Sequence, residues 1–165
     1  MIPKKILPYL DVTRQNIDSD NTQTEGILTC CNAHDFEIHA VGEIKNSLFS
    51  KMYLFPKDHK LALEARCKKC GKVISVFDSS CDGYVCCEEN LLHTNIANIA
   101  ARPIGCRKCG ENDFSVGLRY EYPDTQELKD LGIAEADNGF TWIWVTLDCN
   151  RCSAKYRNFI DFEMA

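Results

Sequence analysis

The order of hydrophobic and polar positions predicts a mainly β protein, in which one helix links two small β modules. Strands are expected at 35–44, 51–55, 61–66, 72–77, 114–122, 140–148 and 155–162. The stretch 91–101 carries apolar residues at helical spacing and stops before Pro103, so we expect it to form the linking helix. Residues 125–131 indicate one short helical insertion. The first 25 residues are polar and rich in turn formers, which predicts an N-terminal arm.

The predicted strand at 140–148 has two apolar faces. One face would carry Phe140, Trp142 and Trp144. The other face would carry Ile143, Val145 and Leu147. A strand with one solvated face would alternate between apolar and polar residues instead. The aromatic face is therefore expected either to pack on the rest of the protein or to form a surface for a partner.

The spacing of the cysteines gives the strongest chemical signal. The chain has 11 cysteines, and three pairs have the form Cys-x-x-Cys: Cys67–Cys70, Cys106–Cys109 and Cys149–Cys152. Such a pair can turn tightly enough to present both thiolates to one tetrahedral ion, and two pairs complete a structural zinc site. A further cluster, Cys30-Cys31-Asn-Ala-His34, offers additional ligands.

The residues around these pairs carry a family resemblance. Gly71 and Gly110 follow the second cysteine of two pairs, at a position that commonly needs a positive φ. Basic residues inside the turns favour thiolate over thiol. These short stretches resemble the zinc knuckles of the zinc-ribbon superfamily. The resemblance implies small antiparallel sheets built on zinc knuckles, and it implies nucleic-acid binding or a place in transcription or translation.

An internal comparison divides the chain into two related halves. Residues 31–38 align without a gap on 109–116, and residues 67–77 align on 149–159. The predicted organisation is an arm (1–25), a zinc-ribbon-like module (26–80), a linker with the helix (81–104) and a second module (105–165). We therefore expect two zinc ions per chain. The predicted ligands are Cys30, Cys31, Cys67 and Cys70 for the first ion and Cys106, Cys109, Cys149 and Cys152 for the second.

Two questions about these ligands stay open at the level of sequence. The central pairs, 67/70 and 106/109, could bind one ion together, which would leave the outer clusters to find each other. In the first half, Leu28 occupies the position of Cys106, so the missing ligand is either Cys30 or His34. His34 has Cys-x-x-His spacing from Cys31, whereas adjacent cysteines strain the backbone. We assign Cys30 and keep His34 open.

A third cluster contains Cys81, Cys86, Cys87 and His93. These residues could form another metal site, and neither half of the chain duplicates them. Unpaired cysteines also occur as small buried hydrophobic residues. The sequence leaves both interpretations open.

Charge and composition narrow the classes of function. The chain has 165 residues, of which 45% are hydrophobic, and a net charge of −5. Binders of duplex DNA or anionic membranes normally show a basic footprint, so the total charge disfavours both, although a local basic patch would remain compatible. No secretory signal or stretch of 18 apolar residues is visible. We expect a cytoplasmic protein with reduced, metal-binding cysteines.

The candidate chemistry favours binding over catalysis. The four histidines lie in no recognisable nucleophile or general-base motif, and a four-cysteine zinc site is closed to substrate. We expect a non-enzymatic zinc protein that binds a protein partner with a basic surface, as an adaptor or as an inhibitor such as an immunity protein. No membrane, small-molecule substrate or tight generic nucleic-acid binding is expected. The alternative is a nucleic-acid-binding or transcription- or translation-associated factor of the zinc-ribbon type.

Overall fold

The protein is built almost entirely from antiparallel β-strands. A computed structural model describes residues 2–17, 21–49, 51–83, 100–123, 130 and 139–164. The elements are η1 (Leu7–Tyr9), β1 (Leu10–Ile17), β2 (Asn21–Leu28), β3 (Phe36–Val41), β4 (Glu43–Asn46), β5 (Met52–Phe55), β6 (Ala62–Cys67), β7 (Val73–Asp78), β8 (Arg102–Pro103), β9 (Phe114–Pro123), β10 (Trp142–Cys149) and β11 (Lys155–Glu163). None of the described helical residues belongs to a helix that could cross a membrane.

Nine of these strands form one continuous sheet, and β4 and β5 form a separate hairpin. Strand β9 connects the sheet because it pairs with β2 along one edge and with β10 along the other. At its start, β9 also meets β3 through the pair Phe36 and Phe114. The sheet contains two antiparallel meanders, β3-β6-β7 and β9-β10-β11, while β1 pairs with β2 and β8 pairs with β3.

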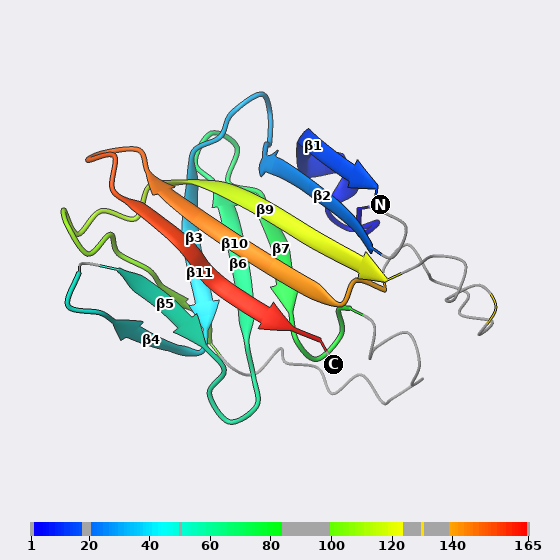
Figure 1. Cartoon of the computed structure of the whole chain (residues 1–165). Helices are drawn as coiled ribbons and strands as arrows, with labels where there is room; N and C mark the ends of the chain where they lie inside the picture. Colours follow the sequence, from blue (N-terminus) through cyan, green and yellow to red (C-terminus); the bar gives the residue numbers. More distant parts are fainter. Residues whose placement is uncertain are drawn as a thin grey trace.

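The sheet curls so that its two meanders face each other across the core. Figure 1 shows β3, β6 and β7 behind β9, β10 and β11, with the strand directions crossing. The ring of Phe77 on β7 lies 5.6 Å from the ring of Phe162 on β11, between ring centroids. Fully buried side chains come from both layers, among them Phe36, Ile38, Leu63, Phe77, Phe114, Tyr120, Ile143, Val145 and Phe159. Apolar burial between the two layers therefore stabilises the sheet as a unit.

Strand β10 confirms the predicted alternation along most of its length. Ile143, Val145 and Leu147 are fully buried in the core. Trp142 and Trp144 point to the opposite face and are half-buried. The expectation that Phe140 shares this face is wrong, because Phe140 precedes β10 and only 1% of it is exposed. It packs into the core at 5.1 Å from the ring of Tyr120, between centroids.

The expectation of two separate modules joined by a helix is wrong. The halves share one sheet, because β9 is long enough to pair with β2 and β10 and still reach β3. The predicted linking helix at 91–101 has no counterpart among the described residues: 91–99 lie outside them, and Ala100 and Ala101 are not helical. The predicted insertion at 125–131 also lies outside them, apart from Asp130.

In place of the predicted N-terminal arm, the structure has two paired strands, β1 and β2. Strand β1 pairs with β2, and β2 pairs with β9 over Asn21–Ile27. Thr24 and Leu28 of β2 are buried, so alternate residues of this strand enter the core. Strand β1 is exposed except at Leu10 and is held by its pairing with β2. Its polarity made it resemble an arm, since a strand that buries little shows no apolar alternation.

Candidate metal centres

The second cysteine group gathers four thiols from two turns. Cys106 and Cys109 precede β9, and Cys149 and Cys152 lie at the turn between β10 and β11. All four Sγ atoms lie within 4.8 Å of one another. The Sγ atoms of Cys106 and Cys152 are 3.6 Å apart, and those of Cys109 and Cys149 are 3.7 Å apart. We call this group the second site.

These distances match the requirements of a tetrahedral thiolate site. Metal–sulfur bonds of about 2.3 Å, as in zinc sites, place neighbouring sulfurs about 3.8 Å apart at the corners of a tetrahedron. The four thiols of the second site could therefore hold a metal ion with little rearrangement. The eight predicted ligand cysteines are all thiols, and none of them forms a disulfide.

Two matching turns present these thiols. In the first turn, the N–H of Gly110 donates to the carbonyl of Cys106 at 2.7 Å, and Gly110 has a φ of 81°. In the second turn, the N–H of Ser153 donates to the carbonyl of Cys149 at 2.9 Å, and Ser153 has a φ of 59°. Glycine adopts such a φ without a steric cost, which explains its place in the first turn.

A tyrosine that the sequence analysis did not identify supports the second site. The Tyr156 oxygen lies 3.1 Å from Sγ of Cys106 and accepts a hydrogen bond of 2.9 Å from the N–H of Arg107. Its own proton is thus directed toward the sulfur. Burial opposes ionisation of Cys106, but hydrogen bonds from Tyr156 and from the backbone N–H groups of Cys109 and Lys108 lower its pKa to about 6.

Two of the neighbouring thiols, those of Cys109 and Cys149, ionise less readily. A backbone hydrogen bond from Glu111 favours the thiolate of Cys109, but partial desolvation and the three neighbouring thiols raise the pKa of Cys109 to about 12. Burial raises the pKa of Cys149 as well. One thiolate therefore forms easily, and further negative charge accumulates only if a cation compensates for it. The cluster has the electrostatic character of a cation site.

The first site is less complete. The Sγ atoms of Cys30, Cys31 and Cys70 lie within 4.8 Å of one another, with Cys30 at 3.8 Å from Cys31 and 3.6 Å from Cys70. The fourth predicted ligand, Cys67, lies beside this group, and its thiol donates a weak hydrogen bond to the carbonyl of Cys30 at 3.8 Å. These three thiols could also hold a metal ion, with Cys67 adjacent as a possible fourth ligand. We call these four cysteines the first site.

Adjacent cysteines require an unusual backbone in the first site. Cys31 and Asn32 both have a positive φ, 54° and 56°, which non-glycine residues adopt only at a cost. The turn closes by two hydrogen bonds between the backbones of Cys30 and Ala33. Burial raises the pKa of Cys30 to about 12, whereas a backbone hydrogen bond from Lys72 and contacts with the other thiols lower that of Cys70 to about 7.

The structure separates the remaining candidates from both groups. His34 turns away from the thiols, and its Nδ1 lies 3.1 Å from the carbonyl of Leu28. Cys30, rather than His34, is therefore the residue that joins the first group. In the possible third cluster, Cys81 is exposed, and Cys86, Cys87 and His93 lie outside the described residues.

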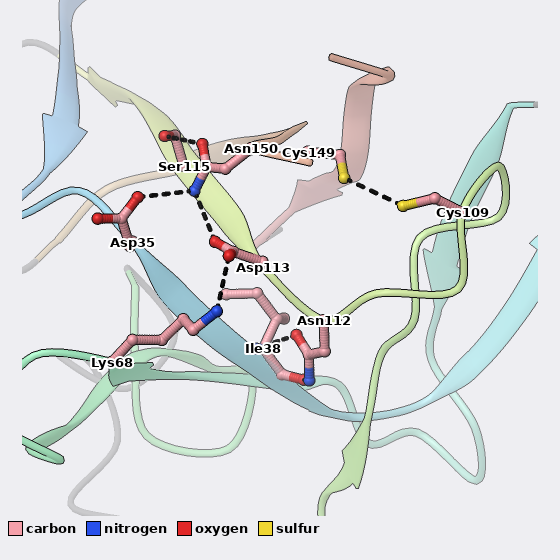
Figure 2. Close-up of polar contacts among 9 residues, drawn as sticks. All are labelled: Asp35, Ile38, Lys68, Cys109, Asn112, Asp113, Ser115, Cys149 and Asn150. Carbon is pink, nitrogen blue, oxygen red and sulfur yellow. Dashed lines mark hydrogen bonds and ion pairs between the residues drawn. The ribbon is translucent and has the colours of Figure 1, made fainter. Parts of the chain in front are cut away.

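A polar network, which we call the cross-tie, connects the turns of the two sites (Figure 2). Nζ of Lys68, from the turn of Cys67 and Cys70, lies 2.6 Å from Oδ2 of Asp113, which immediately precedes β9. Asn150, from the turn of Cys149, donates through Nδ2 to Asp113 at 2.9 Å and to Asp35 at 3.1 Å. Burial opposes ionisation of Asp113, but the contacts with Lys68 and Asn150 outweigh it and lower its pKa.

Backbone hydrogen bonds reinforce the cross-tie. The N–H of Lys68 donates to the carbonyl of Asp35 at 3.0 Å, and the N–H of Asn150 donates to the carbonyl of Asp113 at 2.9 Å. Asn112 extends the contact, because its side chain both donates to and accepts from the backbone of Ile38 on β3. No motif in the sequence indicates this network, since its members are ordinary polar residues that only the curled sheet brings together.

The resemblance to zinc ribbons rests on the two cysteine groups. Both groups are compatible with zinc-binding modules, and the second has the complete set of four thiols. The strands around them belong to one shared sheet, which differs from the separate modules that the resemblance implied. A comparison with protein-family models, curated proteins and solved structures finds no match for this chain.

Proposed function

We propose that this chain is a zinc-binding protein whose metal sites are structural and which acts by binding a protein partner. Two clusters of thiols support zinc, because soft thiolate ligands in a tetrahedral arrangement favour zinc over magnesium or calcium. The second site supports a structural role, because four sulfur ligands leave no coordination position open for a substrate. Bound at both sites, zinc would hold together turns from four parts of the chain.

The proposal of a protein partner rests on one surface of the sheet, which we call the tryptophan face. We use this name for Trp142, Trp144 and their cross-strand neighbours Arg119, Glu121, Asp161 and Glu163. The two indole rings stack at 5.2 Å with an angle of 6° between their planes. The guanidinium of Arg119 lies 3.8 Å from the ring centre of Trp144. Tryptophan and arginine on a shared surface are typical anchors of protein interfaces.

The charge of this face favours a basic partner. Trp142 lies between Glu121 and Glu163 on the neighbouring strands, and its Nε1 donates to Asp161 at 2.7 Å. Arg119 is the one basic residue among these neighbours. Beside Trp144 the face is hollowed by a cavity of about 380 Å³, and Gly117 lies on its lining. An acidic rim around aromatic anchors attracts a basic surface and speeds its association.

Total charge supports the same class of partner. A zinc ion with four thiolates adds −2, so two such centres would change the net charge from −5 to about −9. An acidic protein of this size suits an inhibitor of a basic protein, such as an immunity protein, or an adaptor. The competing candidate is a nucleic-acid-binding factor of the zinc-ribbon type, which the shared cysteine chemistry favours and the charge opposes.

The test combines two measurements on the zinc-loaded protein. Pull-down from native cytosol, followed by titration with the purified captured protein, should give binding that Trp142→Ala/Trp144→Ala weakens by about a hundredfold. Tyr53→Ala, an aromatic substitution on β5, serves as the control and should change affinity little. Mobility-shift titrations with mixed DNA and RNA at about 0.15 M salt should show no tight binding. Submicromolar binding to nucleic acid would replace this proposal with the competing candidate.

A further inference from the structure

The hairpin of β4 and β5 ends in two exposed apolar side chains. Leu48 is 98% exposed and Phe49 is 84% exposed, the highest values among the large hydrophobic residues that the structure describes. Figure 1 shows the hairpin at the periphery, outside the main sheet and next to β11. Scattered single apolar residues are normal on a surface, but two consecutive ones at the end of a hairpin expose a continuous apolar tip.

The tip is held in place by its surroundings. The N–H of Ser47 donates to the carbonyl of Lys51 at 3.0 Å, which closes the turn. Arg107, from the cysteine turn of the second site, donates through Nη1 to the carbonyls of both Ser47 and Lys51. Met52 and Leu54 on β5 are buried at 2% and 4% exposure. The hairpin is thus anchored to the body of the protein while Leu48 and Phe49 point into solvent.

The hairpin is also basic, in contrast to the rest of the chain. The hairpin, residues 43–55, contains two lysines and one acidic residue, a net charge of +1, which leaves −6 for all other residues. Lys51 lies beside the tip and Arg107 lies against it, whereas the ammonium of Lys45 lies 5.0 Å from the ring centre of Phe55, away from the tip. Glu43 lies at the opposite end of the hairpin, where it pairs with Phe55. Lys51 and Arg107 therefore place positive charge next to the apolar tip.

We propose that this hairpin docks the protein onto an anionic lipid surface. Leu48 and Phe49 would enter the boundary between headgroups and acyl chains, where apolar side chains gain by leaving water. Lys51 would remain at the level of the lipid phosphates, because a lysine side chain can extend its ammonium group away from the apolar region. Each basic residue near an anionic leaflet adds attraction that salt weakens.

The distribution of charge explains why this surface is absent from the sequence-based expectation. A net charge of −5 predicts no membrane binding, but that value averages a basic hairpin with an acidic remainder. The basic partner proposed for the tryptophan face would be repelled by Lys45 and Lys51. Nucleic acid would be attracted to the lysines, but only Phe49 of the two tip residues offers a ring for base stacking, and Leu48, the more exposed of the two, does not. An anionic bilayer satisfies both the charge and the apolar tip.

The experiment measures cosedimentation of the zinc-loaded protein with vesicles. We expect binding to vesicles of equimolar phosphatidylserine and phosphatidylcholine, reduced binding in high salt, and much weaker binding to phosphatidylcholine alone. Leu48→Ser/Phe49→Ser should lower the partition coefficient by at least about tenfold. The matched control is Ile17→Ser/Val73→Ser, which removes two exposed aliphatic residues on β1 and β7 and should change it less than about twofold. Circular dichroism and metal content verify the fold of each variant.

Three results would overturn the proposal. The first is no binding to anionic vesicles at low salt. The second is equal loss of binding in the tip variant and in the matched control. The third is a tip variant that binds vesicles normally but loses binding to single-stranded RNA, which would assign the hairpin to nucleic acid. Because the tryptophan face is unchanged in both double variants, failure here leaves the proposed protein partner unaffected.

Discussion

The two cysteine groups differ in how the chain brings their thiols together. The second site uses two Cys-x-x-Cys turns, and its four sulfurs lie within 4.8 Å of one another. The first site has one such turn and a pair of adjacent cysteines, and three of its sulfurs meet this distance. The fourth, that of Cys67, contacts the backbone of Cys30 instead. In the first site the adjacent thiols of Cys30 and Cys31 do converge, at 3.8 Å, whereas the Cys67–Cys70 turn contributes only Cys70 to the group.

Contacts made by residues other than the ligands increase the difference between the two sites. In the second site, Tyr156 directs its hydroxyl toward Cys106. In the first site, the outer contact is between Nζ of Lys69 and the carbonyl of Cys31 at 2.9 Å, on an exposed part of the turn. The turns of the first site contain two non-glycine residues with a positive φ, Cys31 and Asn32, whereas those of the second site contain one, Ser153. We therefore expect the second site to bind its metal more tightly.

The largest expected effect comes from removing one ligand of each site. Cys109→Ser should abolish metal binding at the second site and with it binding free energy on the order of 10 kcal/mol, so that the shared sheet unfolds at room temperature. Cys31→Ser should cost markedly less, because its site has three gathered thiols and a strained turn. Thermal unfolding followed by circular dichroism, together with metal analysis, measures both. Cys81→Ser is the control and should remain within about 0.5 kcal/mol of the original protein.

A stable Cys109→Ser variant that retains its full metal content would contradict the assignment of the second site. Equal destabilisation by Cys31→Ser and Cys109→Ser would contradict the ranking of the two sites. The two outcomes are distinguishable, because the first concerns metal content and the second concerns stability.

When a chelator removes the metal, the two sites should lose their ions at different rates. We expect about two equivalents of zinc in the purified protein, released in a fast and a slow phase. Cys31→Ser should lack the fast phase, because the exposed first site loses its ion first. A single equivalent would show that the adjacent cysteines do not form a metal site. Three equivalents would assign a site to Cys81 with cysteines outside the described residues.

The cross-tie predicts a smaller effect, in which a substitution in one site changes the rate of metal release from the other. Lys68 lies in a turn of the first site, but its ammonium contacts Asp113 beside the second. Lys68→Ala should destabilise the protein by about 1 kcal/mol and accelerate the slow phase of metal release by up to about fivefold. Lys69→Ala, in the same turn, removes a bond that stays within the first site and should leave the slow phase unchanged. Equal rates in both variants would exclude coupling through this ion pair.

The smallest effect is expected at Tyr156. Its hydroxyl stabilises the thiolate of Cys106, so Tyr156→Phe should raise the pKa of that thiol. Protons then compete better with the metal, and the pH at which the second site loses half of its metal should rise by about half a unit. The first site serves as the internal reference. A rise at both sites would show general destabilisation and not the loss of this hydrogen bond.

Cysteine spacing predicted which thiols gather, because the geometry of a Cys-x-x-Cys turn is local. Four of the eight predicted ligands form the complete second group, and three others form the first. The strand predictions also hold where local alternation is clear, as at Met52–Phe55 and Phe114–Pro123. Tyr156 could not be recognised, since a tyrosine four residues beyond Cys152 supports a thiolate only once β11 turns it back toward Cys106.

Long-range pairing explains what the sequence could not predict. Strand β1 buries only Leu10, so nothing in its residues distinguishes it from a polar arm. The union of the two halves depends on β9, whose partners lie far away in the chain. Phe140 has the same alternation as Trp142, but the chain bends before β10 begins and carries its ring into the core. Strand pairing and side-chain burial at these positions therefore depend on the curled sheet as a whole and not on neighbouring residues.

The stacked tryptophans also give the protein an optical reporter. The chain contains two tryptophans, and both belong to one pair of nearly parallel rings on β10. At a separation of 5.2 Å their electronic transitions couple, so near-ultraviolet circular dichroism should contain a signal from this pair. Zinc has no absorption band that would mask it, being a d¹⁰ ion. Near-ultraviolet circular dichroism can thus report the integrity of the sheet while metal is added or removed, without an attached label.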